Sequence, residues 1–355
     1  MRTILIPVLA LLASAACGCT VIGFDTPYNK GIDAYRAGNL PEAIEHFKVA
    51  IEKKPTFYEA WYNLALTYDE LAQSRIRLAE AREAHPGDRG TGSTSSVPPA
   101  ALREQAVKDT EKADATYQKC LEVNPKAAHA LVSYAMFRLD QGDADAAQQL
   151  LERAVKAETD RAWVLTAQGA FFQQQGRRDE ALAAYQGALV REPRDALTHY
   201  RLGTWHEDGN DLAAARSEYE TATNLAPSDA MAWRRLGYLC AKQGEPLRGA
   251  ASLETALSLD KGGEGTRADR IALLIDIAKW YQAAGYHERA VHALWRARDQ
   301  AADDALTAPL LKASYAVLQH EEEVRESSSP ARGTNSPRVP PVRDDATPPG
   351  NNSGG

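Results

Sequence analysis

The sequence predicts an all-α protein built from stacked helix hairpins, and three observations carry that prediction. Residue types recur every 34 positions along most of the 355-residue chain. The recurring columns pair small side chains with one bulky side chain, as closely packed helices require. A glycine or asparagine recurs where each hairpin must turn, and such residues end helices in the left-handed conformation. The composition, 44% hydrophobic and 25% charged, is ordinary for a globular protein.

The first residues have the pattern of an export signal. A basic residue precedes the nine-residue apolar run 4–12, and small residues then lead to Cys17 and Cys19. Because a membrane-spanning helix needs ~20 residues, residues 1–16 are predicted to be a secretory signal. The approach to a cysteine resembles a bacterial lipobox, which implies lipidation of Cys17 or Cys19 and an outer-membrane anchor facing the periplasm. Cleavage without a lipid, giving a periplasmic protein, is the alternative.

Seven copies of the 34-residue repeat share four columns. Position 8 is small: Gly31, Ala65, Ala135, Gly169, Gly203, Gly237, Ala278. Position 20 is also small: Ala43, Ala113, Ala147, Ala181, Ala215, Gly249, Ala290. Position 24 is large: Phe47, Tyr117, Leu151, Tyr185, Tyr219, Leu253, Leu294. Position 27 is small again: Ala50, Cys120, Ala154, Ala188, Ala222, Ala256, Ala297.

Turn residues and prolines mark the ends of the predicted helices. The predicted turn residues are Gly38, Gly142, Gly176, Asn210, Gly244 and Gly285. Prolines are predicted to end the second helix of four repeats: Pro55, Pro125, Pro193 and Pro227. We expect each repeat to be one hairpin of two helices, of which we call the first helix A and the second helix B. The small residues at positions 8 and 20 let the two helices approach closely, and the bulky residue at position 24 fills the space beside them.

This spacing and these residue types resemble the tetratricopeptide repeat. The resemblance implies a right-handed superhelical α-solenoid of seven hairpins over residues 24–304, preceded by an N-terminal linker at 17–23. The repeats are expected near 24–57, 58–127, 128–161, 162–195, 196–229, 230–263 and 271–304. An amphipathic capping helix is predicted at 305–326, and a Pro-, Gly- and Ser-rich tail at 327–355 is predicted to be disordered.

Repeat 2 is interrupted by an insertion at about 72–107. Its helix A is predicted to continue from Tyr58 to about Ala84, and after a polar loop a second helix is predicted from about Ala100. This hairpin should therefore project beyond its neighbours. A shorter Gly-rich insertion, 262–269, separates repeats 6 and 7.

Cys120 and Cys240 are predicted to be buried and unpaired thiols. They lie four repeats apart, and each repeat advances the stack by about one helix spacing of ~10 Å. A disulfide needs Cα atoms within ~7 Å.

Motifs for chemistry are missing from the sequence. It contains no P-loop and no HExxH, so no cofactor, metal site or small-molecule substrate is predicted. His199 and His206 could be metal ligands on one helical face, but positions 4 and 11 face the core in the family, and a structural role is favoured. The net charge of −7 gives no reason to expect nucleic-acid binding.

The resemblance implies a non-catalytic scaffold or adaptor that binds a protein or peptide segment in a concave groove, in assembly of an envelope, pilus or secretion complex. An accessory subunit that recruits an envelope hydrolase or transferase is the alternative, and an enzyme with an unfamiliar site ranks below both. Helix A positions 2, 5, 6, 9, 12 and 13 are expected to line the groove and to be exposed, and packing against the helix of the next repeat is the alternative for Trp163, Tyr200 and Arg234. The groove residues are then Trp163, Tyr200, Arg201, Met231, Arg234, Arg235 and Tyr238.

Overall fold

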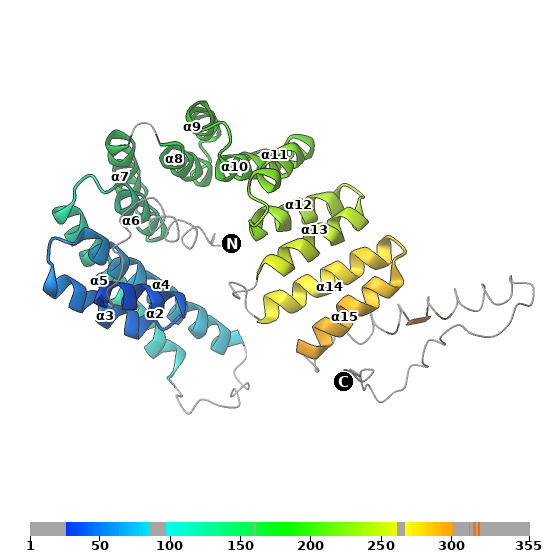
Figure 1. Ribbon diagram of the computed structural model, residues 1–355, viewed down its shortest axis with the longest axis horizontal. Coiled ribbons are helices and arrows are strands. Elements are labelled where there is room, and N and C mark those ends of the chain that lie inside the picture. The colour runs from blue at the N-terminus through cyan, green and yellow to red at the C-terminus, as the bar shows by residue number, and fades with distance from the viewer. Residues whose placement is uncertain are drawn as a thin grey trace, which may run out of the picture. The chain divides into compact units, whose positions relative to one another are not determined.

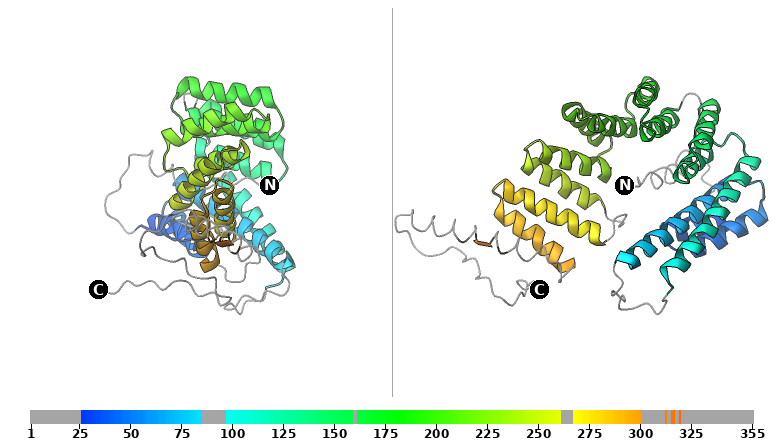
Figure 2. Two further views of the ribbon diagram at one scale, coloured as in Figure 1. Left: turned by 90° about the vertical axis from the view of Figure 1, so that its right-hand side faces the viewer. Right: turned by 180° about the vertical axis from the view of Figure 1, so that it is seen from behind.

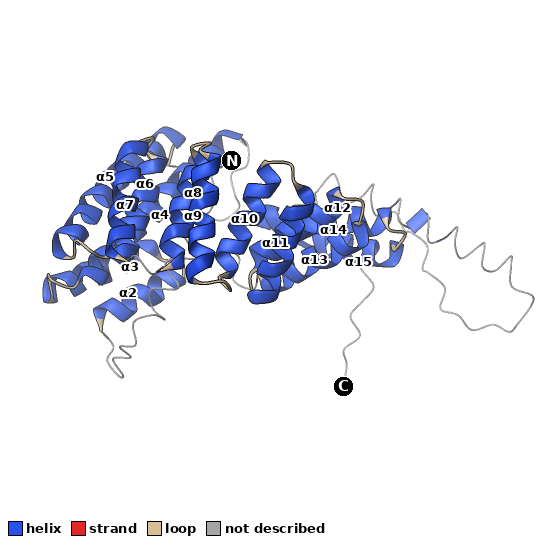
Figure 3. Ribbon diagram, turned by 90° about the horizontal axis from the view of Figure 1, so that it is seen from above, coloured by secondary structure: helices blue, strands red, loops and turns tan. Residues whose placement is uncertain are grey.

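The computed structural model describes residues 26–84, 97–158, 161–260 and 267–300, and four single residues at 312, 315, 316 and 319. The described residues form fourteen helices and no strand (Figure 3). The predicted signal 1–16, linker 17–23 and tail 327–355 lie outside the described residues. No helix among the described residues combines the length and the apolar character needed to cross a membrane.

The chain divides into two compact units, residues 1–192 and 193–355. Eight helices belong to the N-terminal unit (Figure 1): α2 Pro27–Arg36, α3 Leu40–Lys53, α4 Tyr58–Ala84, α5 Pro99–Val123, α6 Ala128–Asp140, α7 Ala144–Ala157, α8 Ala162–Gln174 and α9 Arg178–Arg191. Six belong to the C-terminal unit: α10 Ala196–Asp208, α11 Leu212–Leu225, α12 Ala230–Lys242, α13 Pro246–Leu259, α14 Arg267–Ala283 and α15 His287–Gln300. Consecutive helices pack as hairpins, so the all-α prediction is confirmed.

The turns have the predicted backbone. The five glycines have φ between 74° and 84°, and Asn210 has φ 59°, within the left-handed region. The four prolines each follow a helix that ends two residues earlier. Aspartate side chains start several of the following helices by accepting backbone N–H groups, as Asp143 does from Ala146 at 3.0 Å.

The small columns are needed for close helix approach. A Cβ added at Gly169 would lie 2.6 Å from the Tyr185 ring, and one added at Gly203 would lie 2.6 Å from the Tyr219 ring. These contacts join positions 8 and 24 within a repeat, as the sequence predicts. All described side chains at positions 20, 24 and 27 are buried.

The interrupted repeat forms a long hairpin, as predicted. Helix α4 has 27 residues and α5 has 25, whereas the next hairpin has helices of 13 and 14 residues (Figure 2). The buried carboxylate of Asp109 holds the extension together through ion pairs to Arg75 and Lys112. The polar loop lies outside the described residues.

The seventh repeat departs from its expected bounds. Helix α14 begins at Arg267 and not at Ile271, so the end of the predicted 262–269 insertion belongs to a helix. The predicted capping helix 305–326 lies mostly outside the described residues. Its described Tyr315 hydroxyl accepts a hydrogen bond from Trp295 Nε1 at 2.7 Å.

Both described cysteines are buried and free, as predicted. Burial raises the pKa of the Cys120 thiol to about 12. It also raises the pKa of Cys240. Cys17 and Cys19 lie outside the described residues.

Candidate functional site

The predicted groove residues fall in both units. Trp163 lies on α8 of the N-terminal unit, and the other six lie on α10 and α12 of the C-terminal unit. The Trp163 ring is half-buried and stacks on His129 of α6, with ring centroids 4.4 Å apart. Packing therefore occupies one face of this indole.

The expectation that Tyr200 is exposed is wrong. Its side chain is 5% exposed, and its ring packs on Tyr219 of α11 with centroids 5.8 Å apart. Arg235 of the next repeat lies close enough to interact with it electrostatically. Tyr200 is thus part of the packing between repeats and not a free contact residue.

The position of Tyr200 in the repeat explains its burial. In the N-terminal unit, Asn63 Nδ2 donates to the Tyr28 hydroxyl at 3.0 Å, and the Tyr62 and Ser133 hydroxyls are 3.1 Å apart. Each pair joins position 5 of one repeat to position 6 of the next. Side chains at position 5 therefore contact helix A of the next repeat. A helical wheel drawn for one helix does not show such contacts between repeats.

Four accessible helix A side chains of the C-terminal unit, Arg201, Met231, Arg234 and Arg235, form what we call the basic face. Arg234 and Arg235 are exposed, whereas Arg201 and Met231 are half-buried. Arg235 lies 3.7 Å from the Glu207 carboxylate, which also accepts the Tyr219 hydroxyl at 2.7 Å. Glu207 therefore offsets one of the three arginine charges.

Tyr238 borders the basic face and is half-buried. Its hydroxyl donates to Asp276 of α14 at 3.2 Å, and its ring meets Trp280 edge-on with centroids 5.3 Å apart. Both contacts join α12 to α14.

His199 has a structural role. Its Nδ1 lies 2.7 Å from Glu218, and its Nε2 lies 3.2 Å from the Pro193 carbonyl. Trp61 and Trp233 occupy the same repeat position, and their Nε1 groups donate to carbonyls of the corresponding prolines at 2.9 and 3.0 Å. In the described part of the chain, no group of three or more His, Cys, Asp or Glu residues could hold a metal ion.

Charged side chains on the outer side of helix B form ion pairs between neighbouring repeats. Arg216 pairs with Glu245 of the next repeat at 2.6 Å and with Glu220 at 2.9 Å, and Glu220 also binds Arg248 at 2.8 Å. These ion pairs link repeats 5 and 6. Glu220 therefore contributes to packing, although the sequence gives it no role.

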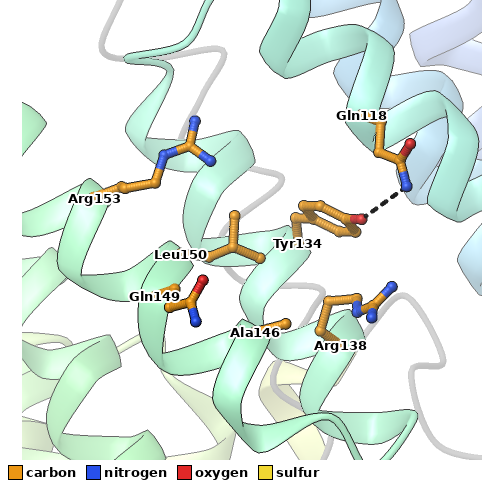
Figure 4. Close-up of a pocket in the computed structure, with 7 residues that line it drawn as sticks. All are labelled: Gln118, Tyr134, Arg138, Ala146, Gln149, Leu150 and Arg153. Carbon is orange, nitrogen blue, oxygen red and sulfur yellow. Dashed lines mark hydrogen bonds between the residues drawn. The ribbon is translucent and has the colours of Figure 1, made fainter.

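The N-terminal unit contains an open pocket of about 330 Å³, which no motif in the sequence indicates. It is lined by three helices, with Tyr134 and Arg138 from α6, Gln118 from α5, and Leu150 and Arg153 from α7 among its walls (Figure 4). The Asp114 carboxylate accepts hydrogen bonds from the Tyr134 hydroxyl at 2.9 Å and from the Arg138 guanidinium at 3.0 Å. Two polar groups that line the pocket are therefore already bonded within the protein.

Three tetratricopeptide repeat family models match the chain, at residues 46–81, 105–169, and 166–223 with 200–264. Together these matches cover more than half of the chain. The chain belongs to the tetratricopeptide repeat family. Repeats of this family are protein-interaction modules that are generally non-catalytic, so the fold supports a protein-interaction scaffold.

Individual relatives are distant. An uncharacterized protein of Methanocaldococcus jannaschii is 39% identical over 56 residues, which are 16% of this chain and 60% of that protein. The Pseudomonas aeruginosa pilF structure is 17% identical, with a TM-score of 0.44, over 72% of this chain and 99% of that one. A tetratricopeptide repeat protein from Parabacteroides merdae is 16% identical, with a TM-score of 0.45, over 81% and 97% of the two chains.

The Cut9–Hcn1 complex of the APC/C is a further similar structure. The match is 15% identical with a TM-score of 0.44, and it covers 78% of this chain and about half, 52%, of that one.

Proposed function

We propose that this protein is a non-catalytic scaffold or adaptor of the bacterial cell envelope, which binds a segment of a partner protein along its helix A faces. The basic face carries this proposal. It places two exposed arginines, Arg234 and Arg235, beside half-buried Arg201 and Met231 on neighbouring helices A. Arginine is enriched in binding hot spots, and arginine and methionine are both enriched in the cores of protein interfaces.

The envelope part of the proposal rests on the N-terminal sequence. An apolar run, small residues and a cysteine favour export and a lipid anchor at Cys17 or Cys19, in the outer membrane facing the periplasm. Assembly of an envelope, pilus or secretion complex is the form of scaffolding that this location favours.

The alternative is an accessory subunit that recruits an envelope hydrolase or transferase. Both functions need the same binding surface, so the partner distinguishes them. Cross-linking in intact cells followed by mass spectrometry identifies that partner, and a stably bound enzyme would favour the accessory role.

A photo-cross-linking amino acid at Met231 tests the basic face directly. We expect it to capture the partner, whereas the same group at Gln186, exposed on helix B of repeat 4, should not. Arg201→Glu combined with Arg234→Glu should reduce capture at least tenfold, because two charges of the contact surface are reversed.

The control for this double variant is Arg296→Glu, which reverses an exposed charge on α15 of the same unit. It should leave capture unchanged, and thermal unfolding should verify that every variant is folded. Capture that survives the double variant and occurs from Gln186 would place the binding surface on helices B.

A further inference from the structure

Repeat 3 departs from three other repeats at the wall of the pocket in the N-terminal unit. Position 11 is Arg138 in repeat 3, whereas repeats 2, 4 and 7 have an aromatic residue there: Tyr68, Phe172 and Tyr281. The Arg138 guanidinium forms ion pairs with Asp114 at 3.0 Å and with Asp143, the N-cap residue of α7. A fixed cation therefore lines this wall in place of a ring.

The two carboxylates beside Arg138 are satisfied within the protein. The Asp114 carboxylate accepts hydrogen bonds from three side chains: Gln118, Tyr134 and Arg138. Asp143 accepts the backbone N–H of Ala146 at 3.0 Å, at the N-terminus of α7, where a negative charge is stabilised. Within the described part of the chain, no aspartate or glutamate lines the pocket itself. An incoming group therefore meets no acidic side chain in the wall.

Arg153 is the second cation of the pocket, and it forms no ion pair with any residue that the structure describes. Its side chain is exposed on α7, and its Nη2 group donates to the Pro125 carbonyl at 3.5 Å, which is long for a hydrogen bond. Because a guanidinium has five N–H donors, most of them are available to a ligand. Gln149 lies one turn before Arg153 on the same helix, is also exposed and adds an amide donor.

An apolar floor lies between these polar groups. Tyr134 and Leu150 occupy the middle of the pocket, with Arg153 to one side and Gln118 to the other (Figure 4). Both floor side chains are buried, and the Tyr134 ring stacks on Tyr117 with centroids 5.1 Å apart. Ligand pockets span about 300–1,000 Å³, so a volume of about 330 Å³ suits a single side chain better than a larger ligand.

We propose that Arg153 and Gln149, together with the floor of Tyr134 and Leu150, form a subsite for one glutamate or aspartate side chain of a partner protein. A carboxylate can accept two parallel N–H groups from a guanidinium, and such bonds are about twice as strong as those between neutral groups. The methylene groups of the same side chain would contact the floor. This inference rests on the proposed scaffold function, because it names the chemistry of a second contact, outside the basic face, with such a partner.

The test is a titration of the full-length protein with N-acetyl-glutamate α-amide, whose only charged group is the side-chain carboxylate. The ¹H–¹⁵N resonances of the Arg153 Nε–H group and of the Gln149 side-chain amide report binding. We expect saturable shifts of both resonances at pH 7, where the carboxylate of the probe is ionised. N-acetyl-glutamine α-amide has the same shape without the charge, and it should bind at least tenfold more weakly.

Two variants and a matched control are followed through the Gln149 amide. Arg153→Gln removes the cation and should reduce the affinity for the probe at least tenfold. Arg153→Lys keeps the charge but not the planar pair of donors, so it should reduce the affinity severalfold. Lys156→Gln removes the same charge from an exposed site on α7 that does not line the pocket, and it should leave the affinity unchanged. Thermal unfolding verifies that each variant is folded.

Equal probe affinity in the wild type and Arg153→Gln would overturn the subsite. Equal losses from Arg153→Gln and Lys156→Gln would also overturn it, because they would indicate unspecific attraction between charges. A neutral probe that binds as well as the charged one, or a charged probe that gives no saturable shift, would have the same meaning.

Partner capture in cells separates the two proposals. If the wild type captures no partner but the probe binds at Arg153 as expected, the scaffold proposal fails and the subsite stands. Capture that Arg153→Gln leaves intact, without probe binding, would have the opposite meaning.

Discussion

Asp69 shows how one buried group can couple stability to pH. Because its folded pKa is raised from 3.8 to about 7, the folded state binds the proton more tightly than the unfolded state does. The stability that this group contributes is fully present below about pH 4 and is lost as pH rises through about 7. We expect Asp69→Asn to be more stable than the wild type at pH 8, by on the order of 2–4 kcal/mol.

Urea unfolding of both proteins at pH 4.5 and pH 8 checks this prediction, since the difference between their free energies of unfolding should be severalfold smaller at the lower pH. A pH-independent difference would show that Asp69 does not titrate in this window.

Two glycines of repeat 4 should respond in opposite ways to alanine. Gly169→Ala places a Cβ 2.6 Å from the Tyr185 ring, which overpacks the hairpin and should cost about 1–3 kcal/mol. At Gly187, in the interior of α9, the nearest side-chain atom would be 3.6 Å away. Gly187→Ala should therefore stabilise the helix by up to ~1 kcal/mol. Thermal melting of the two variants compares them directly, and equal shifts would mean that the repeat register is wrong.

At the scale of elements, the long α4–α5 hairpin depends on a buried ion pair. Arg75→Met leaves the Asp109 carboxylate, 3% exposed, with only the more exposed Lys112. We expect a loss on the order of 3 kcal/mol, because an incompletely paired buried charge is costly.

Replacing both partners in the double variant Arg75→Met and Asp109→Leu should restore most of this stability, since apolar side chains can substitute for a buried ion pair. Hydrogen exchange of the α4 and α5 amides locates the effect in the hairpin. A double variant that is less stable than Arg75→Met would show that the ion pair itself stabilises the extension.

At the scale of the whole molecule, we predict that lipid on Cys17 or Cys19 holds the protein at a membrane. A single acyl chain gives only weak, reversible binding, so stable anchoring needs more than one chain. Changing both cysteines to serine should move the protein from the membrane fraction to the periplasmic fraction, as measured by cell fractionation and mass spectrometry of the N-terminal peptide. A double variant that stays in the membrane would contradict the anchor.

The elements of this protein could be predicted closely because their signals are local. The predicted starts of α6, α8, α10 and α12 agree with the structure, since a helix end is specified by neighbouring backbone groups and capping residues. The start of α14 was missed by one turn: the Gly-rich stretch suggested a longer linker, yet the residues from Arg267 join the helix.

The sequence by itself determined the hairpins, their turns and the small and bulky columns, because each follows from residues within one 34-residue repeat. Only the tertiary structure decided which helix A side chains are available. Tyr200 is buried against Tyr219 and interacts with Arg235 of the next repeat, and Tyr117 is fully buried without a hydrogen-bond partner for its hydroxyl. These outcomes depend on side chains that only packing brings together, either between repeats or, in repeat 2, across a 36-residue insertion that hides their periodicity.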